Sequence, residues 1–213
     1  PPAAAPEGSQ AGQYSLTIAD GEDAPVLRIT RTYVVKPGSY DIDLRQSLEN
    51  LTERPLNVTF SQNIQGDLPQ DRGAYLGDRR MYFTGFINLN YGRKRILGSE
   101  NYITRNTLLE GGRLWPNPHL AADAPLEPIW LASTNRYFTV VTHPLLKPSQ
   151  KTQDLPPLTA QFDGRQIKTD ILPTPGLSDD NAIVFNMQTK KLRLAPGGAQ
   201  DVSLGIYAGP QKK

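Results

Sequence analysis

The sequence lacks cysteine entirely and has only two histidines and two tryptophans among its 213 residues. Without cysteine, the chain has no disulfide framework, no Cys-ligated zinc site and no thiol nucleophile. A domain of this length buries enough apolar surface to fold without such cross-links. The 23 basic and 21 acidic residues nearly balance, so the net charge of +2 gives no indication of nucleic-acid binding.

Long hydrophobic runs are also missing. No apolar run approaches the roughly 18 residues that a membrane-crossing helix needs, and the chain does not open with the basic and apolar segments of a signal peptide. Residues 1–13 are rich in Pro, Ala, Gly, Ser and Gln, which is typical of a linker or disordered tail. We therefore expect a single domain over residues 14–210, with linkers at both ends of the sequence.

Alternation of apolar and polar residues dominates from Tyr14 onward. The clearest example is residues 40–48. One face of this segment is apolar and consists of Tyr40, Ile42, Leu44 and Leu48. The other face is polar and consists of Asp41, Asp43, Arg45 and Ser47. This pattern predicts a strand with one buried and one solvated face. Similar runs at 27–35 and 56–65, with turn-forming residues at 36–39, predict a meander of three long antiparallel strands.

The rest of the chain has the same character. Short apolar runs recur at 81–87, 96–97, 129–134, 137–143, 158–162, 182–187, 192–194 and 202–207. Between them, Gly and Pro mark loops at 66–80, 108–128 and 144–158. No segment shows helical periodicity over a dozen residues, and the 19 Pro and 18 Gly interrupt any long helix. The predicted fold is all-β and antiparallel, with few or no long helices.

Residues suited to catalysis occur without a convincing pattern. His119 and His143 have no metal-ligand spacing. Pairs of carboxylates, the groups that glycoside hydrolysis uses, occur at Asp41/Asp43, Glu22/Asp23 and Asp179/Asp180, but solvation on a strand face explains them equally well. Nucleophile-elbow, P-loop and dinucleotide-binding motifs are absent. We therefore predict no catalytic, cofactor-binding or metal site, and no cofactor.

Two groups of residues are of a kind that can bind ligands. Basic residues lie beside tyrosines at Arg79-Arg80 with Tyr82 and at Arg93-Lys94-Arg95 with Tyr91. Such groups can contact the phosphates of nucleic acid or lipid, although a solvated loop is the simpler interpretation. Trp130, Tyr137 and Phe138 flank one predicted hairpin. They could stack on a sugar ring, although packing in the core is the commoner role of such residues.

Three stretches of the sequence resemble the periplasmic domain of the YidC insertase family. The first, residues 29–58, has a strand, a turn and a second strand with the family's residues at Lys36, Gly38, Tyr40, Asn50, Pro55 and Leu56. The second, residues 128–145, has them at Trp130, Ala132, Tyr137, Phe138 and Pro144. In the third, residues 194–210, a Pro-Gly turn leads to a strand that closes with Tyr-x-Gly-Pro. The intervening residues 66–128 and 146–180 differ from well-known members, which indicates a divergent lineage.

The resemblance implies an antiparallel β-supersandwich similar to galactose mutarotase. It also implies a location on the periplasmic side of the bacterial inner membrane, with a membrane helix before residue 1 and the insertase core after Gly209-Pro210. The implied role is non-catalytic. The domain would support the membrane core of the same polypeptide and offer a docking surface to other translocation components. The implied partners are the SecD–SecF complex and nascent membrane proteins, with no nucleic acid among them.

Two alternatives remain open at this point. One is a carbohydrate-binding or carbohydrate-active β-sandwich, which predicts a cleft lined by aromatic residues with two carboxyl groups converging on it. The other is a purely structural spacer. Since one fold supports many functions, the mutarotase-like fold does not by itself favour the carbohydrate alternative.

Overall fold

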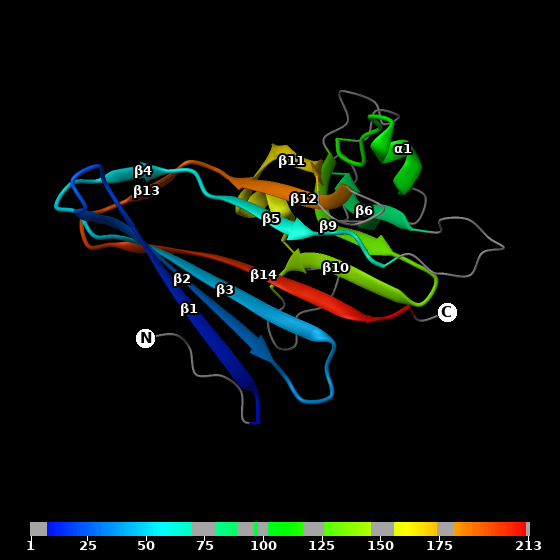
Figure 1. Cartoon of the computed structure of the whole chain (residues 1–213), viewed down its shortest axis with the longest axis horizontal. Helices are drawn as coiled ribbons and strands as arrows, with labels where there is room; N and C mark the ends of the chain where they lie inside the picture. The colour runs from blue at the N-terminus through cyan, green and yellow to red at the C-terminus, as the bar shows by residue number, and fades with distance from the viewer. Residues whose placement is uncertain are drawn as a thin grey trace.

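The structure is a computed structural model that describes residues 8–69, 80–88, 96–97, 102–116, 126–145, 156–173 and 181–211. Antiparallel strands dominate these residues (Figure 1). One large sheet has the strand order β1-β2-β3-β14-β10-β9-β6-β7, and β8 also pairs with β6. Its strands are β1 (Gln10–Ala19), β2 (Pro25–Val35), β3 (Asp41–Asn50), β6 (Met81–Asn88), β7 (Ile96–Leu97), β8 (Tyr102–Thr104), β9 (Leu126–Thr134), β10 (Phe138–Pro144) and β14 (Ala199–Pro210).

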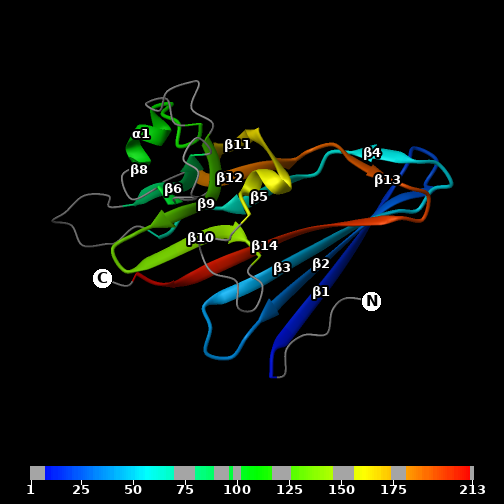
Figure 2. The same ribbon diagram turned by 180° about the vertical axis from the view of Figure 1, so that it is seen from behind.

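A second, smaller layer covers part of this sheet. It consists of a three-stranded sheet, β11-β12-β5, and a two-stranded ribbon, β13-β4. Figures 1 and 2 show the smaller sheet lying over the region of β9, β10 and β14. Its elements are β4 (Leu56–Val58), β5 (Ser61–Gln65), β11 (Phe162–Pro173), β12 (Asn181–Thr189) and β13 (Leu192–Leu194). The predicted antiparallel sandwich is therefore confirmed.

Helical structure in the described residues is short. Helix α1 (Arg105–Leu109) has five residues and begins at Thr104, whose side chain accepts a hydrogen bond from the backbone N–H of Thr107. A 3-10 turn, η2 (Leu158–Ala160), precedes β11, so the predicted strand at 158–162 is wrong over most of its length. Among the described residues, no helix has the length and apolar character to cross a bilayer.

The hydrophobic core lies between the two layers. The ring of Tyr82 on β6 meets that of Phe185 on β12 edge to face, with centroids 6.3 Å apart. The buried residues of this core are Leu27, Leu48, Phe60, Ile64, Tyr82, Phe86, Leu108, Leu114, Trp115, Leu131, Leu158, Phe162, Ile167, Ile183, Phe185, Met187, Leu194, Val202 and Leu204. Because side chains alternate along a strand, the same strands of the large sheet also present a second, outer face.

The predicted hairpin at 36–39 is confirmed, but the predicted meander is wrong. Gly38 has a φ of +70°, and Ser39 N donates to the carbonyl of Lys36, so the turn joins β2 to β3 as expected. The other neighbour of β3 is β14, near the end of the chain. The run at 56–65 divides into β4, which pairs with β13, and β5, which pairs with β12, both in the smaller layer. Alternation specifies a strand and its faces, but not its pairing partner.

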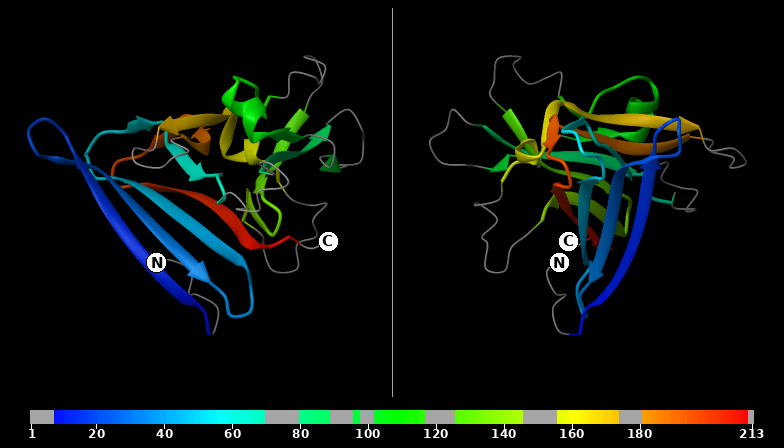
Figure 3. Two further views of the ribbon diagram at one scale, coloured as in Figure 1. Left: turned by 45° about the vertical axis from the view of Figure 1, so that its right-hand side comes forward. Right: turned by 90° about the vertical axis from the view of Figure 1, so that its left-hand side faces the viewer.

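The predicted tail ends earlier than expected. Strand β1 begins at Gln10, opposite Val35, so residues 10–13 belong to the sheet and not to a linker. Every residue of β1 is exposed, because β1 and its neighbours extend beyond the smaller layer (Figure 3). An edge strand without a covering layer needs no apolar residues at its start, so composition alone predicted a linker there. The assignment of residues 14–210 to a single domain stays a prediction.

Candidate functional site

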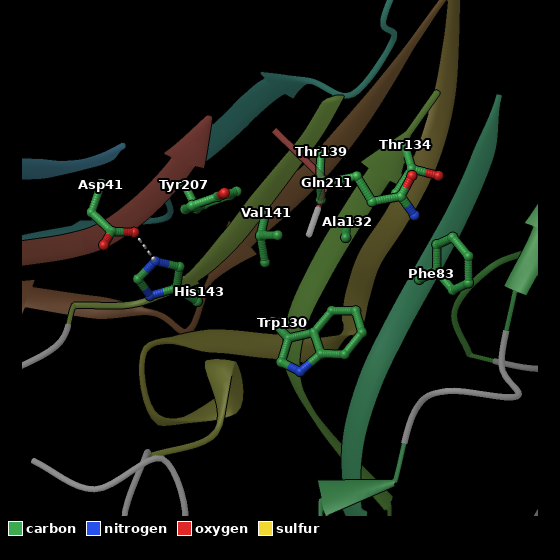
Figure 4. Close-up of a pocket in the computed structure, with 10 residues that line it drawn as sticks. All are labelled: Asp41, Phe83, Trp130, Ala132, Thr134, Thr139, Val141, His143, Tyr207 and Gln211. Carbon is green, nitrogen blue, oxygen red and sulfur yellow. Dashed lines mark ion pairs between the residues drawn. The ribbon is translucent and has the colours of Figure 1, made fainter. Parts of the chain in front are cut away.

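A groove of about 460 Å³ opens on the outer face of the large sheet (Figure 4). Five adjacent strands, or the residues that follow them, supply its lining: Asp41, Phe83, Trp130, Ala132, Thr134, Thr139, Val141, His143, Tyr207 and Gln211. Alternation along β9 explains its position. Leu131 points into the core between the layers, while Trp130 and Ala132 point to the groove.

Glycines opposite two rings shape this groove. Gly85 on β6 pairs with Trp130, and Gly205 on β14 pairs with His143. A Cβ atom built on Gly85 would lie 2.1 Å from the Trp130 indole, and one on Gly205 would lie 2.1 Å from the His143 imidazole. Only glycine therefore allows these rings to cover the neighbouring strand, as aromatic residues commonly do over glycines in sheets.

A histidine and a carboxylate lie together at one end of the groove. His143 Nε2 is 3.7 Å from the Asp41 carboxylate, and His143 Nδ1 is 2.8 Å from the carbonyl oxygen of Pro144. A carbonyl oxygen only accepts, so Nδ1 is the donor to Pro144, and Nε2 is the ring nitrogen that faces Asp41. The His143 side chain is 12% exposed and that of Asp41 is 42% exposed. This end of the groove can therefore hold a polar group of a ligand.

The rest of the groove is mainly aromatic and aliphatic. Trp130 and Phe83 form one wall, with Val141 between them and Tyr207 (Figure 4). Phe83 is supported by Tyr102, whose ring centroid is 5.6 Å away. An apolar groove with a few polar groups at its ends is typical of a binding site, and its open shape suits an extended chain.

Comparison with known proteins identifies the family. The sequence model of the YidC periplasmic domain family matches residues 3–213, almost the whole chain. The chain belongs to the YidC periplasmic domain family. No curated protein sequence matches it.

Solved structures share the fold at low sequence identity. A galactose mutarotase related enzyme from Lactobacillus acidophilus superimposes with a TM-score of 0.50 at 9% identity, covering 95% of this chain and 68% of that one. A putative aldose 1-epimerase from Klebsiella pneumoniae superimposes with a TM-score of 0.48 at 11% sequence identity, covering 94% of this chain and 50% of that one. The first likeness agrees with the predicted mutarotase-like sandwich, and at this identity it concerns the fold alone.

The structure of this YidC periplasmic domain separates the predicted carboxylate pairs. Asp41 lines the groove, but Asp43, predicted on a solvated face, is buried between Lys36 and Arg45 at 3.2 and 3.3 Å. The outer face is covered at this point, because the neighbouring Val34 is also buried. Glu22 and Asp23 lie in the exposed turn between β1 and β2. The other predicted residues, His119 and Asp179/Asp180, lie outside the described residues.

Arg80 and Tyr82 are buried, so for these two residues both interpretations of the sequence, phosphate contact and a solvated loop, are wrong. Both are buried around Asp67, which accepts from the Tyr82 hydroxyl at 2.8 Å and pairs with Arg80 at 3.4 Å and with Arg105 at 3.3 Å. Arg105 also donates to the carbonyl of Asn181 at 2.6 Å. Burial, reinforced by the charge of Asp67, raises the pKa of Tyr82 far above its usual value.

This cluster joins β6, α1 and β12, so its role is structural. The sequence could not predict this cluster for two reasons. A basic dipeptide next to an aromatic residue has the same sequence pattern whether it is exposed or buried, and Asp67 lay in a segment predicted to be a loop. Arg79, Tyr91 and Arg93-Lys94-Arg95 lie outside the described residues. Within the part of the chain that the structure describes, no three His, Asp or Glu side chains converge as a metal site would require.

The aromatic residues of the predicted hairpin have different surroundings. Trp130 forms a wall of the groove, whereas Tyr137 and Phe138 are 54% and 53% exposed, so the expectation that they pack in the core is wrong. Sequence reasoning also missed the approach of His143 to Asp41. Glycines inside predicted strands, at positions 85 and 205, were the available signal, because strand glycines often mark a place where a ring crosses.

Proposed function

We propose that this chain is the non-catalytic periplasmic domain of a YidC-type membrane protein insertase, located on the periplasmic side of the bacterial inner membrane. In this role it supports the membrane-embedded core of the same polypeptide and offers a docking surface to other components of protein insertion. The observation that carries the proposal is the family match over residues 3–213.

The groove supports the docking part of this proposal. Its walls stand on hydrogen-bonded strands, so its shape is fixed before a partner binds, which lowers the entropic cost of binding. Apolar rings with hydroxyl and amide groups nearby suit a polypeptide segment that presents an apolar side chain while its backbone finds hydrogen-bond partners. SecD–SecF and nascent membrane proteins are the partners we propose.

The small number of carboxylates among the described residues of the groove counts against a glycoside hydrolase. Hydrolysis of a glycosidic bond uses two carboxyl groups about 5 to 10 Å apart. Among the described residues that line the groove, Asp41 is the single carboxylate, and it already faces His143. Similarity of fold to mutarotases does not transfer their activity.

Site-specific photo-crosslinking in the complete insertase tests the docking part. A benzoylphenylalanine at Val141 or Phe83 is expected to form adducts with SecD–SecF or with a nascent membrane protein. The same probe at exposed Thr17 on β1 is the control. The proposal fails if the groove positions give no more adduct than Thr17.

A polarimetric assay tests the non-catalytic part. We expect the isolated chain to leave the rate of galactose mutarotation at that of buffer. A rate above buffer that is lost on His143→Ala would contradict this part of the proposal and leave the docking part to be judged by the crosslinks.

A further inference from the structure

The described domain begins and ends at the same margin of the large sheet. Gln10, the first residue of β1, pairs with Val35 at the end of β2, and Val35 pairs with Ile42 at the start of β3. Ile42 pairs in turn with Ile206 of β14, which runs on to Pro210. Figure 1 shows the start of β1, the turn between β2 and β3 and the end of β14 along this margin. The outer ends of the first and last strands of the large sheet, Gln10 and Pro210, therefore lie at one margin.

Exposed aromatic side chains lie along this margin. Tyr40 comes from the turn between β2 and β3 and is 57% exposed. Tyr137 comes from the turn between β9 and β10, and Phe138 is the first residue of β10. Phe138 pairs with Pro210, and the carbonyl of Tyr137 accepts from Gln211 N at 2.8 Å. We call Tyr40, Arg136, Tyr137 and Phe138 the exit rim. Neighbouring aromatic residues with half their surface in water mark an interaction surface.

The backbone of the exit rim is held in place. The side chain of Asn135 accepts from the N–H groups of Tyr137 and Phe138 at 2.9 and 2.8 Å. The carbonyl of Tyr40 accepts from Ala208 N at 2.9 Å, and its ring meets that of Tyr207 edge to face, with centroids 6.1 Å apart. The rim therefore presents its rings from a fixed backbone, which loses little conformational entropy when they are covered.

Arg136 places a positive charge on the rim. The Arg136 guanidinium lies 5.4 Å from the centre of the Tyr137 ring. Of the carboxylates nearest in the sheet, Asp43 lies between the cations Lys36 and Arg45, and Asp41 lies 3.7 Å from His143. Tyrosine, phenylalanine and basic residues together are the groups that settle at a membrane–water interface.

We propose that the exit rim docks on the surface of an anionic phospholipid bilayer. The rings enter the headgroup region, and Arg136 meets the phosphates. The inference rests on the proposed function, in which the domain belongs to a membrane-embedded polypeptide. It adds that the domain stands on the bilayer by this margin of the sheet, with the Tyr207 end of the groove close to the lipid.

A second exposed apolar patch supplies a matched control. Leu16 and Ile18 on β1 are 62% and 42% exposed, on an uncharged strand. They lie six and eight residues beyond Gln10, roughly 20 to 27 Å along the strand at its usual rise per residue. General hydrophobic adsorption would involve both patches, whereas docking through the exit rim depends on the rim alone.

The test is flotation of the isolated chain with vesicles of phosphatidylcholine, with and without phosphatidylglycerol. The unmodified chain is expected to float with the anionic vesicles. Tyr137→Ser/Phe138→Ser should weaken this binding by about tenfold or more, since two partly buried rings are lost. Arg136→Gln should weaken it by about fivefold, for anionic vesicles only. Leu16→Ser/Ile18→Ser should leave it unchanged.

Two results would overturn the inference. One is failure of the unmodified chain to bind either vesicle, as expected if the rim contacts protein. The other is an equal loss of binding in the rim and β1 double variants. Urea unfolding of each variant verifies that it is folded, which is expected because the replaced side chains are exposed. Failure here would leave the groove crosslinks, which do not depend on lipid contact by the rim, as the separate test of the proposed function.

Discussion

The two faces of the large sheet differ although the same strands form them. On β14, Leu204 points inward and is fully buried, whereas Tyr207 points outward to the groove. On the inner face, the side chains that lie beneath the smaller layer pack against it. On the outer face, rings lie over glycines and leave open space. The inner face therefore provides most of the stability, and the outer face can present a binding surface at little cost to the fold.

Leucine-to-alanine substitution on the inner face should produce the largest effect. Leu204→Ala leaves a cavity between the layers and should lower the free energy of unfolding by about 2 to 5 kcal/mol. Val141→Ala, on the outer face of the adjacent strand, should cost below about 1 kcal/mol because its neighbourhood is already open. Urea titration of both variants measures the contrast. Equal costs would mean that the outer face is packed as tightly as the core.

Removing a buried carboxylate should have nearly as large an effect. Asp67→Asn takes the negative charge from between Arg80 and Arg105 and should cost about 3 kcal/mol, as when one partner of a buried ion pair is lost. Asp41→Asn, in the partly exposed groove, should cost below about 1 kcal/mol. Chemical denaturation of both variants measures these costs. The prediction is contradicted if the Asp41→Asn variant is the less stable of the two.

These two carboxylates also show what the sequence can and cannot predict. Local alternation and turn residues predicted β2, β3, β9 and β10, because those signals lie within about ten residues of each other. The pairing of β3 with β14, and the approach of Asp67 to Arg80 and Arg105, depend on contacts between distant segments. The groove was missed for the same reason, since His143 reaches Asp41 only across β14.

The glycine beneath His143 offers a test of how the groove is built. Gly205→Ala places a methyl group where the imidazole now lies, so the ring must move, at a cost of about 1 to 3 kcal/mol. Gly21→Ala is the control, because a Cβ there meets nothing within 4 Å. Denaturation gives the cost, and the NMR signals of the His143 ring report its displacement. An unchanged ring signal would show that the groove tolerates a side chain at this position.

The alkaline limit of stability should depend on the inner face. The pKa of Tyr82 is raised in the folded protein by burial and by Asp67, whereas it is about 10 in an unfolded chain. The folded state therefore keeps the proton that the unfolded state loses, so this contribution is complete below pH 10 and falls as pH rises above it. The loss amounts to about 1.4 kcal/mol per pH unit. Tyr82→Phe should remove this part of the decline when urea midpoints are compared from neutral to alkaline pH.

The smallest effect on stability should come from the pair in the groove. His143 and Asp41 are 3.7 Å apart, and the Asp41 side chain is 42% exposed, so water and salt screen their attraction. A double-mutant cycle of His143→Gln and Asp41→Asn should give a coupling energy below about 1 kcal/mol that falls with added salt. Crosslinking from Val141, in contrast, should change with either substitution, because both side chains line the groove. A coupling energy well above about 1 kcal/mol, together with unchanged crosslinking, would contradict this prediction. It would mean that the pair stabilises the fold and does not contribute to binding.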